Sequence, residues 1–337
     1  VDPDLPTISS ASLSNSATPT LTGTAEVGST VTVVVAGATY ETTATDGNWS
    51  IDTSSTADLD STTTLALNAN GSNTVSVTST DAAGNTSAAA KQTLTLDTTD
   101  ATVSASTDKA DGSYTVGEEI DITLTFDESV TLSGSAGLNI TLQDGSSTTV
   151  ATLNVTAAEL NGVSTVTKTY TVAAGDTAGD LTVSGVALGT SATLQDDAGN
   201  DADLSSLTAT VGTSDAIVID TTAPATPTVA SITTPDDDAT PTITITAEAG
   251  STVAVYANGV ELGNATESST TAGSFSYTSS ALVDGNYSVY ATSTDTAGNV
   301  TESTAQDIII DTVDPDLPTI SSASLSNSAT PTLTGTA

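Results

Sequence analysis

The sequence contains no cysteine, no histidine and no methionine. Without cysteine and histidine, the chain has no disulfide bridges, no thiol catalysis, no common zinc site and no histidine acid–base chemistry. Aromatic residues make up 3% of the chain, with a single tryptophan, Trp49. No apolar run reaches the length of about 18 residues that suggests a membrane span, so we expect no membrane insertion in this segment.

No signal peptide is present, and the sequence opens inside a pattern that recurs later. We therefore expect an excerpt of a longer protein whose targeting signals lie elsewhere.

Basic residues are almost absent as well. Three lysines, Lys91, Lys109 and Lys168, stand against 41 acidic residues, and the formal charge is −38. Such a chain repels nucleic acid and anionic membranes, so neither is an expected partner. Acidic, polar chains are often disordered, but the apolar residues here fall in patterned runs, which favours a folded protein.

A short acidic motif divides the chain. Residues 79–85 read Ser-Thr-Asp-Ala-Ala-Gly-Asn and residues 293–299 read Ser-Thr-Asp-Thr-Ala-Gly-Asn, with a variant, Leu-Gln-Asp-Asp-Ala-Gly-Asn, at 194–200. In the variant we take the second aspartate, Asp197, as the motif aspartate. Each copy precedes a short apolar strand that ends on an aspartate and an acidic linker, so the sequence predicts three modules in a row.

The chain also repeats itself at long range. Residues 1–25 recur unchanged as residues 313–337. Identity over this length indicates tandem duplication of a larger block. We predict a first module at 1–97, a longer second module at 98–220, a third module at 221–311, and the start of the next block at 312–337.

The modules read as β-strands throughout. Several segments are rich in β-branched residues, and within them apolar residues nearly alternate with polar ones. Examples are residues 30–35, 74–78, 138–142 and 166–172. Turn dipeptides occur at Asp46-Gly47, Asn70-Gly71 and Asn258-Gly259. Residues 240–248 of the third module match residues 18–26 of the first.

About seven short strands per roughly 90–120 residues indicate an immunoglobulin-like β-sandwich. We therefore predict an all-β protein of tandem sandwiches arranged as an extended rod of about 120 Å per block. We place Trp49 in a core, because such a ring buries a large area. We also expect a strand at 119–126 followed by a turn at Asp127-Glu128, and a single helical turn at 157–160.

The acidic residues fall where this topology brings loops together. In a seven-stranded sandwich, the loops after the second, fourth and sixth strands share one pole with the incoming linker. The predicted set of the first module is Asp2, Asp4, Glu26, Asp46, Asp81 and Asn85. The predicted set of the second module is Asp97, Asp100, Asp127, Glu128, Asp197 and Asn200. The predicted set of the third module is Asp220, Glu248, Asp295 and Asn299, and the next linker carries Asp311 and Asp314.

Such clusters need a counter-charge. Two carboxylates about 6 Å apart repel by roughly 3 kcal/mol at an effective dielectric constant of about 20, and protein cations are nearly absent. Ca²⁺ accepts about six to eight carboxylate, amide and carbonyl oxygens, whereas Mg²⁺ demands stricter geometry. The sequence therefore predicts Ca²⁺ at the module junctions.

Two other roles for these acids stay open. Aspartate and asparagine routinely cap turns without any metal, and surface acids keep a protein soluble. Close carboxylates also serve glycoside hydrolysis, but that chemistry needs a cleft and gives no reason for recurrence at each boundary. We therefore expect no enzyme activity.

The motifs together resemble a known family. Asp-x-Ala-Gly-Asn, the apolar strand and Asp-Thr-Thr-Ala-Pro at 220–224 resemble the tandem bacterial immunoglobulin-like (Big/Bap-type) repeats of giant adhesins. These are the biofilm-associated and type-I-secreted (RTX) surface adhesins of Gram-negative bacteria. Residues 28–31 with 46–50 look like one repeat subfamily, and residues 114–120 with 126–130 look like another.

This resemblance covers the whole chain and implies a function. The repeats of such adhesins form an extracellular extender, stiffened by calcium at the junctions, that projects a distal binding domain from the cell for adhesion or biofilm formation. The junction aspartates and the Asp-x-Ala-Gly-Asn loops would then be ligands, and the neighbouring repeats would be the partners. One departure is residues 97–100, Asp-Thr-Thr-Asp, which lack the Ala-Pro ending. The alternatives are modules that themselves bind glycan or protein, or a fibre subunit that assembles by strand exchange.

Overall fold

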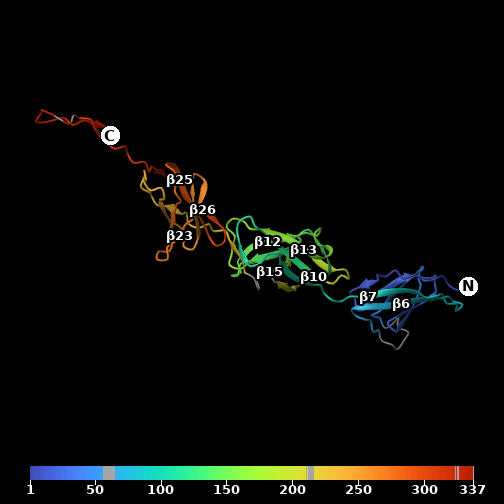
Figure 1. Cartoon of the computed structure of the whole chain (residues 1–337). Helices are drawn as coiled ribbons and strands as arrows, with labels where there is room; N and C mark the ends of the chain where they lie inside the picture. The colour runs from blue at the N-terminus through green and yellow to red at the C-terminus, as the bar shows by residue number, and fades with distance from the viewer. Residues whose placement is uncertain (56–64, 210, 212–215, 323, 325, 337) are drawn as a thin grey trace. The chain divides into compact units, whose positions relative to one another are not determined.

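The computed structural model describes residues 1–55, 65–209, 211, 216–322, 324 and 326–336 (Figure 1). Within these residues every regular element is a β-strand, which confirms the all-β prediction. The chain divides into two compact units. One comprises Val1–Asp111, Glu118–Val172 and Thr177–Val218, and the other comprises Gly112–Gly117, Ala173–Asp176 and Ile219–Ala337.

The first module is a sandwich of two sheets. Its strands are β1 (Leu13–Ser14), β2 (Thr20–Thr24), β3 (Thr30–Val35), β4 (Ala38–Thr43), β5 (Asn48–Asp52), β6 (Gly71–Thr80) and β7 (Ala90–Leu96). The sheet order is β1-β7-β6-β3-β4 on one side and β2-β5 on the other. The predicted strand at 30–35 is β3, in which Val31, Val33 and Val35 point into the core.

Trp49 lies in the core of this module, as predicted. Its side chain is 3% exposed, and its indole Nε1 donates a hydrogen bond to the backbone oxygen of Thr7 at 3.2 Å. The ring also packs on Gly23, where an added Cβ would lie 2.6 Å from it. Trp49 is therefore a packing residue, with no open ring face for a ligand.

The second module has longer strands. They are β8 (Thr102–Thr107), β9 (Gly112–Tyr114), β10 (Glu119–Ser133), β11 (Leu138–Gln143), β12 (Thr149–Val155), β13 (Asn161–Thr171), β14 (Thr177–Ala178), β15 (Thr182–Leu188), β16 (Thr193–Asp196), β17 (Asp203–Ala209) and β18 (Ile217–Asp220). One sheet has the order β13-β10-β8-β17, with β16 also paired to β10, and a second has the order β12-β11-β15.

Strand β10 corrects the predicted turn at Asp127-Glu128. The strand runs without interruption from Glu119 to Ser133, and its register shifts between Thr125 and Val130. Its first half pairs with β8 and its second half with β16. Asp127 and Glu128 therefore lie in an irregularity of one strand, where the pairing partner changes. The predicted helical turn at 157–160 is a hydrogen-bonded turn and not a helix.

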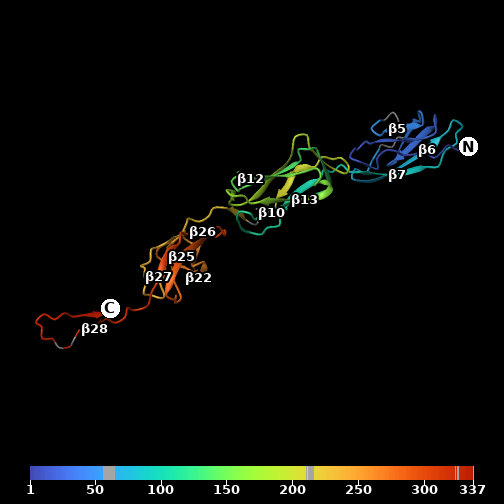
Figure 2. The same cartoon turned by 90° about the horizontal axis from the view of Figure 1, so that it is seen from above.

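The third module repeats the plan of the first. Its strands are β19 (Thr228–Val229), β20 (Thr242–Thr246), β21 (Thr252–Ala257), β22 (Val260–Asn264), β23 (Thr266–Glu267), β24 (Ser274–Thr278), β25 (Gly285–Thr294), β26 (Val300–Glu302) and β27 (Gln306–Ile310). One sheet has the order β19-β20-β24-β23, and the other has the order β22-β21-β25-β26 with β27 also on β25. Figure 2 shows β25 beside β27.

The predicted hairpin at Asn258-Gly259 is present. Ala257 pairs with Val260 across it, and both turn residues have positive φ, 51° and 79°. This is the geometry for which Asn-Gly is preferred, because asparagine tolerates the left-handed region and glycine has no steric cost there.

Among the described residues after Asp311, the short strands β28 (Thr319–Ile320) and β29 (Gly335–Thr336) pair with each other. Leu333 is 76% exposed, whereas Leu21 in the identical segment of the first module is 1% exposed.

Candidate metal centre

Three five-residue turns carry the recurring motif. They begin at Asp81, Asp196 and Asp295 and end at Asn85, Asn200 and Asn299. In each turn the aspartate Oδ1 accepts a hydrogen bond from the backbone N–H of the asparagine, at 2.8, 2.9 and 2.9 Å. The asparagine Nδ2 donates to the aspartate Oδ2, at 2.7, 2.8 and 3.0 Å. In each turn, the aspartate carboxylate and the asparagine are thus hydrogen-bonded to each other, and the turn needs no metal to hold this geometry.

The glycine of the motif has a backbone reason. Gly84, Gly199 and Gly298 have φ values of 88°, 96° and 102°. Residues with a Cβ rarely adopt this region. The glycine of Asp-x-Ala-Gly-Asn therefore allows the turn to form. The turn places the aspartate carboxylate and the asparagine amide next to the end of the preceding strand.

In two of the three turns the asparagine also holds the preceding linker. Asn200 Nδ2 donates to the backbone oxygen of Asp97 at 2.9 Å, and Asn299 Nδ2 donates to that of Asp220 at 3.0 Å. Asp97 follows β7 directly and Asp220 ends β18. The same contact therefore fixes the linker aspartate against the motif turn at two places in the chain.

At the first of these places three carboxylates converge. Oxygen atoms of Asp97, Glu128 and Asp196 all lie within 4.8 Å of one another. Glu128 comes from the irregularity in β10, and Asp196 ends β16, where it pairs with Val130 of β10. Asp196 is 5% exposed. Within the described part of the chain, no other set of three acidic residues meets this spacing.

The electrostatics of this cluster are unfavourable without a cation. Burial raises the pKa of Glu128 above its usual 4.5, and the negative charges of Asp196, Asp97, Asp127 and Asp197 raise it further. Two carboxylates at such a separation repel by roughly 3 kcal/mol at an effective dielectric constant of about 20. In the folded chain, the surroundings of Glu128 therefore disfavour its ionised form.

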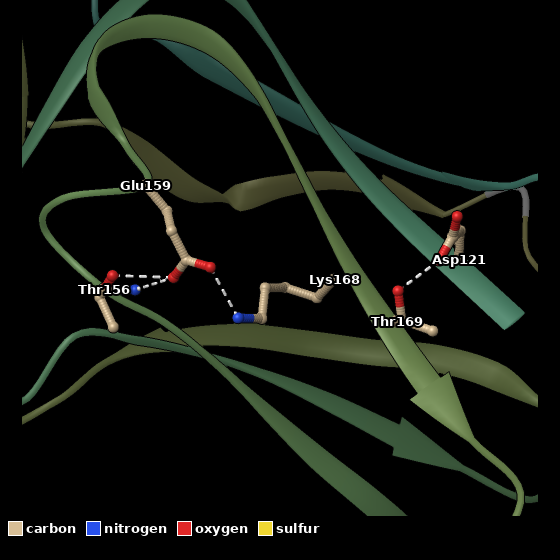
Figure 3. A network of polar contacts seen from close by, with 5 residues as sticks. All are labelled: Asp121, Thr156, Glu159, Lys168 and Thr169. Carbon is tan, nitrogen blue, oxygen red and sulfur yellow. Dashed lines mark hydrogen bonds and ion pairs between the residues drawn. The ribbon is translucent and has the colours of Figure 1, made fainter. Parts of the chain in front are cut away.

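A carboxylate elsewhere in the second module shows the opposite arrangement. Lys168 Nζ donates to Glu159 Oε1 at 2.8 Å, and the backbone N–H and hydroxyl of Thr156 both donate to Oε2 (Figure 3). The hydrogen bond from Lys168 is the largest cause that lowers the pKa of Glu159 to about 2. Glu159 has a protein cation beside it, whereas Glu128 is partly buried and has only acids as charged neighbours, so its pKa is raised by burial first and by those acids second.

Asp127 does not join the cluster. Its carboxylate accepts hydrogen bonds from the backbone N–H and hydroxyl of Thr102, at 2.7 and 2.8 Å. These bonds, the hydroxyl first, hold the pKa of Asp127 below its usual value. Asp127 therefore ties β10 to the start of β8.

The acids of the third module share a hollow. Asp220, Glu248 and Asp295 line a space of about 290 Å³. Partial burial raises the pKa of Asp295, but hydrogen bonds from Asn299, Gly298 and Ala297 outweigh it, so the pKa is lowered overall. Three of the four residues predicted for this module thus line one concavity, and the fourth, Asn299, is hydrogen-bonded to Asp295 and to the backbone oxygen of Asp220.

Among the described residues, the other predicted ligands form no second set of three acids at the spacing of the cluster of Asp97, Glu128 and Asp196. In the first module Asp81 and Asn85 are half-buried in their own turn, and the hydrogen bond from the Asn85 side chain is the largest cause that lowers the pKa of Asp81. The remaining predicted ligands are exposed, namely Asp2, Asp4, Glu26, Asp46, Asp100, Asp197, Asp311 and Asp314.

Asp196 is the residue that the sequence reading missed. The sequence comparison predicts Asp197 as the motif aspartate, but Asp196 makes the turn and Asp197 is exposed. The signal was present, because the motif aspartate stands four residues before its asparagine in the other two copies.

The donor set of the cluster suits a hard divalent cation. It consists of carboxylate oxygens, with the backbone oxygen of Asp97 and the amide of Asn200 beside them. Ca²⁺ binds such oxygen sets, whereas softer transition metals prefer nitrogen and sulfur ligands.

Among the described residues, no helix is both long and apolar enough to cross a membrane.

Comparison with solved structures gives several similar chains. One comes from work on host cell surface retention of a 1.5-MDa bacterial ice-binding adhesin, at TM-score 0.40 and 23% identity, covering 88% of this chain and 92% of that chain. Fibronectin(III)-like modules of Clostridium thermocellum CbhA match at TM-score 0.29 and 15% identity, covering 61% and 92%. The D1–D4 ectodomain fragment of ICAM-5 matches at 0.35 and 12%, covering 94% and 79%.

No curated protein matches this chain. A family model described as "Bacterial Ig-like domain" matches residues 7–98 and 228–312. The two matched segments together make up more than half of the chain and lie in the first and third modules, whose strand plans agree.

Proposed function

The chain belongs to the bacterial Ig-like domain family, and we propose that it is a stalk segment of a bacterial surface adhesin. In this proposal the modules act as an extracellular extender that projects a distal binding domain for adhesion or biofilm formation. The tandem arrangement supports it, because the first and third modules each contain a separate apolar core. Chains of modules with nearest-neighbour contacts suit a mechanical role.

We further propose that Ca²⁺ stiffens the stalk at its linkers. The observation that carries this proposal is the cluster of Asp97, Glu128 and Asp196. Asp97 is a linker residue, while the other two belong to strands of the second module. A cation shared by these carboxylates would fix the linker to the module and relieve their repulsion.

A second Ca²⁺ is proposed at the hollow lined by Asp220, Glu248 and Asp295. The shared arrangement supports it, since Asn299 holds the Asp220 carbonyl in the same way as Asn200 holds that of Asp97. Extracellular modules bind Ca²⁺ with dissociation constants of about 10⁻⁴–10⁻³ M.

Calorimetric titration of the whole chain with Ca²⁺ tests the first site. Asp196→Asn should abolish one binding event, because it removes a charge from the centre of the cluster. Asp197→Asn removes the same charge from the neighbouring exposed residue and should leave the binding event in place. If both variants bind Ca²⁺ like the original chain, the cluster is not a metal site and these aspartates cap turns only.

The rival roles lack a comparable supporting observation. A glycan site on the single tryptophan is disfavoured, because Trp49 is buried. Assembly by strand exchange would require a neighbouring chain to pair with an edge strand. Edge strands such as β4 and β22 are present, but an edge strand is common to all open sheets and does not by itself favour this role. We expect no catalytic activity, as the clustered acids lie at linker ends.

A further inference from the structure

A stacked pair of tyrosines lies on the outer face of the third module. Tyr256 of β21 and Tyr290 of β25 are directly opposite in the antiparallel register. Their ring centroids are 5.0 Å apart and the rings are 6° from parallel. Both are partly exposed, whereas their neighbours Val255 and Ala291 are buried. Since successive strand residues alternate between faces, the pair points away from the core.

Three carboxylates border this pair, one beyond β21 and two beyond β25. On the β22 side, Glu261 is the register partner of Tyr256, and the Tyr256 hydroxyl donates to Glu261 Oε2 at 3.4 Å. No lysine or arginine occurs in the third module. The Tyr256 end of the pair is therefore electronegative.

The Tyr290 end is bordered by two more acids. Asp307 of β27 pairs with Ser288, and Glu302 of β26 pairs with Thr292. Ser288 and Thr292 flank Tyr290 two residues to either side, so both acids are its diagonal neighbours on the same face. Asp307 and Glu302 are exposed. We call Tyr256, Tyr290, Glu261, Asp307 and Glu302 the tyrosine face.

The same positions of the first module carry different chemistry. Val34 and Ser76 are paired there in the register that Tyr256 and Tyr290 occupy in the third module. Their register partners are Thr39, in place of Glu261, and Lys91 on the other side. Cross-strand packing alone explains a tyrosine pair. It does not explain why the positions of Glu261, Asp307 and Glu302, which are neutral in the first module as Thr39, Thr93 and Ala88, carry acids in the third, where Ala305 also replaces Lys91.

We propose that the tyrosine face is a docking surface for arginine side chains of a partner protein. A guanidinium group stacks on aromatic rings and forms forked hydrogen bonds to carboxylates, so it matches both components of the face. The net charge of −38 attracts cationic partners over longer distances. A hollow of about 370 Å³ lined by Ser288 and Asp307 adjoins the face and accommodates an extended side chain.

Isothermal titration of the whole chain with a tetra-arginine peptide in about 0.15 M salt tests this, with tetra-citrulline as the uncharged equivalent. The original chain should bind tetra-arginine, and tetra-citrulline should bind much more weakly. Tyr256→Val with Tyr290→Ser installs the residues of the first module and leaves the charge unchanged. It should weaken tetra-arginine binding about tenfold.

A charge-matched comparison separates the face from the overall field of the chain. Glu261→Thr should weaken binding, whereas Glu41→Thr removes one charge from the corresponding sheet of the first module and should not. This pair decides the question even if the tyrosine variant fails to fold. The proposal is overturned if the two threonine variants bind equally, or if the folded tyrosine variant binds like the original chain. It is also overturned if a neutral tetrasaccharide binds the tyrosines and tetra-arginine does not.

Discussion

Acidic residues of the second module behave differently because their immediate partners differ. Glu159 has Lys168, and the pKa of Glu159 falls to about 2. Asp127 has two donors from Thr102, and its pKa is also lowered. Glu128 is partly buried and lies near other acids, and its pKa is raised. Asp127 and Glu128 are adjacent in the sequence, but their surroundings shift their pKa values in opposite directions.

The raised pKa of Glu128 has a defined consequence for stability. An acid whose pKa is higher in the folded state than in the unfolded state destabilises the fold when ionised. Without a divalent cation, this penalty is present at neutral pH and is lost as the pH falls through the raised pKa, which lies above 4.5. Bound Ca²⁺ would favour the ionised form and remove the penalty.

The substitution Glu128→Gln should therefore act in opposite directions with and without calcium. In chelator at pH 7, it removes the repulsion and should raise the melting temperature of the second module. In millimolar Ca²⁺, it removes a ligand and should lower the melting temperature relative to the original chain. Thermal unfolding in both conditions checks this. A change of the same sign in both would show that Glu128 does not bind the ion.

At the scale of elements, local patterns determined much of the fold. The bounds of β3 and the turn at Asn258-Gly259 follow from alternation and turn chemistry, which depend on neighbouring residues. The path of β10 does not, because its irregularity at Asp127 and Glu128 is set by a change of pairing partner from β8 to β16. Long-range pairing of this kind leaves no local signal.

As with the fold, part of the candidate site was predictable from the sequence and part was not. The turn motif and the linker aspartate Asp97 follow from repetition in the sequence, and so does the acidity of the module pole. The sharing of the site between Asp97, Glu128 and Asp196 depends on how β10 and β16 pair, which the sequence alone does not show. The module boundaries at 97, 220 and 311 stay predictions.

The bond from Asn200 to the Asp97 carbonyl should protect the linker. Asn200→Ala removes this donor, so amide hydrogen exchange at Thr98 and Thr99 should become faster. Asn85→Ala is the matched control, because Asn85 donates in the same way to its own turn aspartate, Asp81. It should loosen that turn and leave the linker amides unchanged. Equal exchange at Thr98 in both variants would mean that the Asn200 bond does not restrain the linker.

At the scale of the whole molecule, the chain is a series of modules whose first and third members have separate cores. Each of these two cores is formed by the strands of its own module. Loss of calcium should therefore loosen linkers while the β-structure of each module persists. At tenfold excess of Ca²⁺ over its dissociation constant, each site adds only about 1.4 kcal/mol to the folded state.

Small-angle X-ray scattering of the chain in millimolar Ca²⁺ and in excess chelator, at matched ionic strength, tests the stalk proposal most directly. Matched ionic strength holds screening constant, with a Debye length of about 8 Å at 0.15 M salt. We predict an extended particle with a well-defined maximum dimension in Ca²⁺, and a broader distribution of dimensions in chelator. A compact particle in Ca²⁺, or identical scattering curves in the two conditions, would contradict a calcium-stiffened stalk.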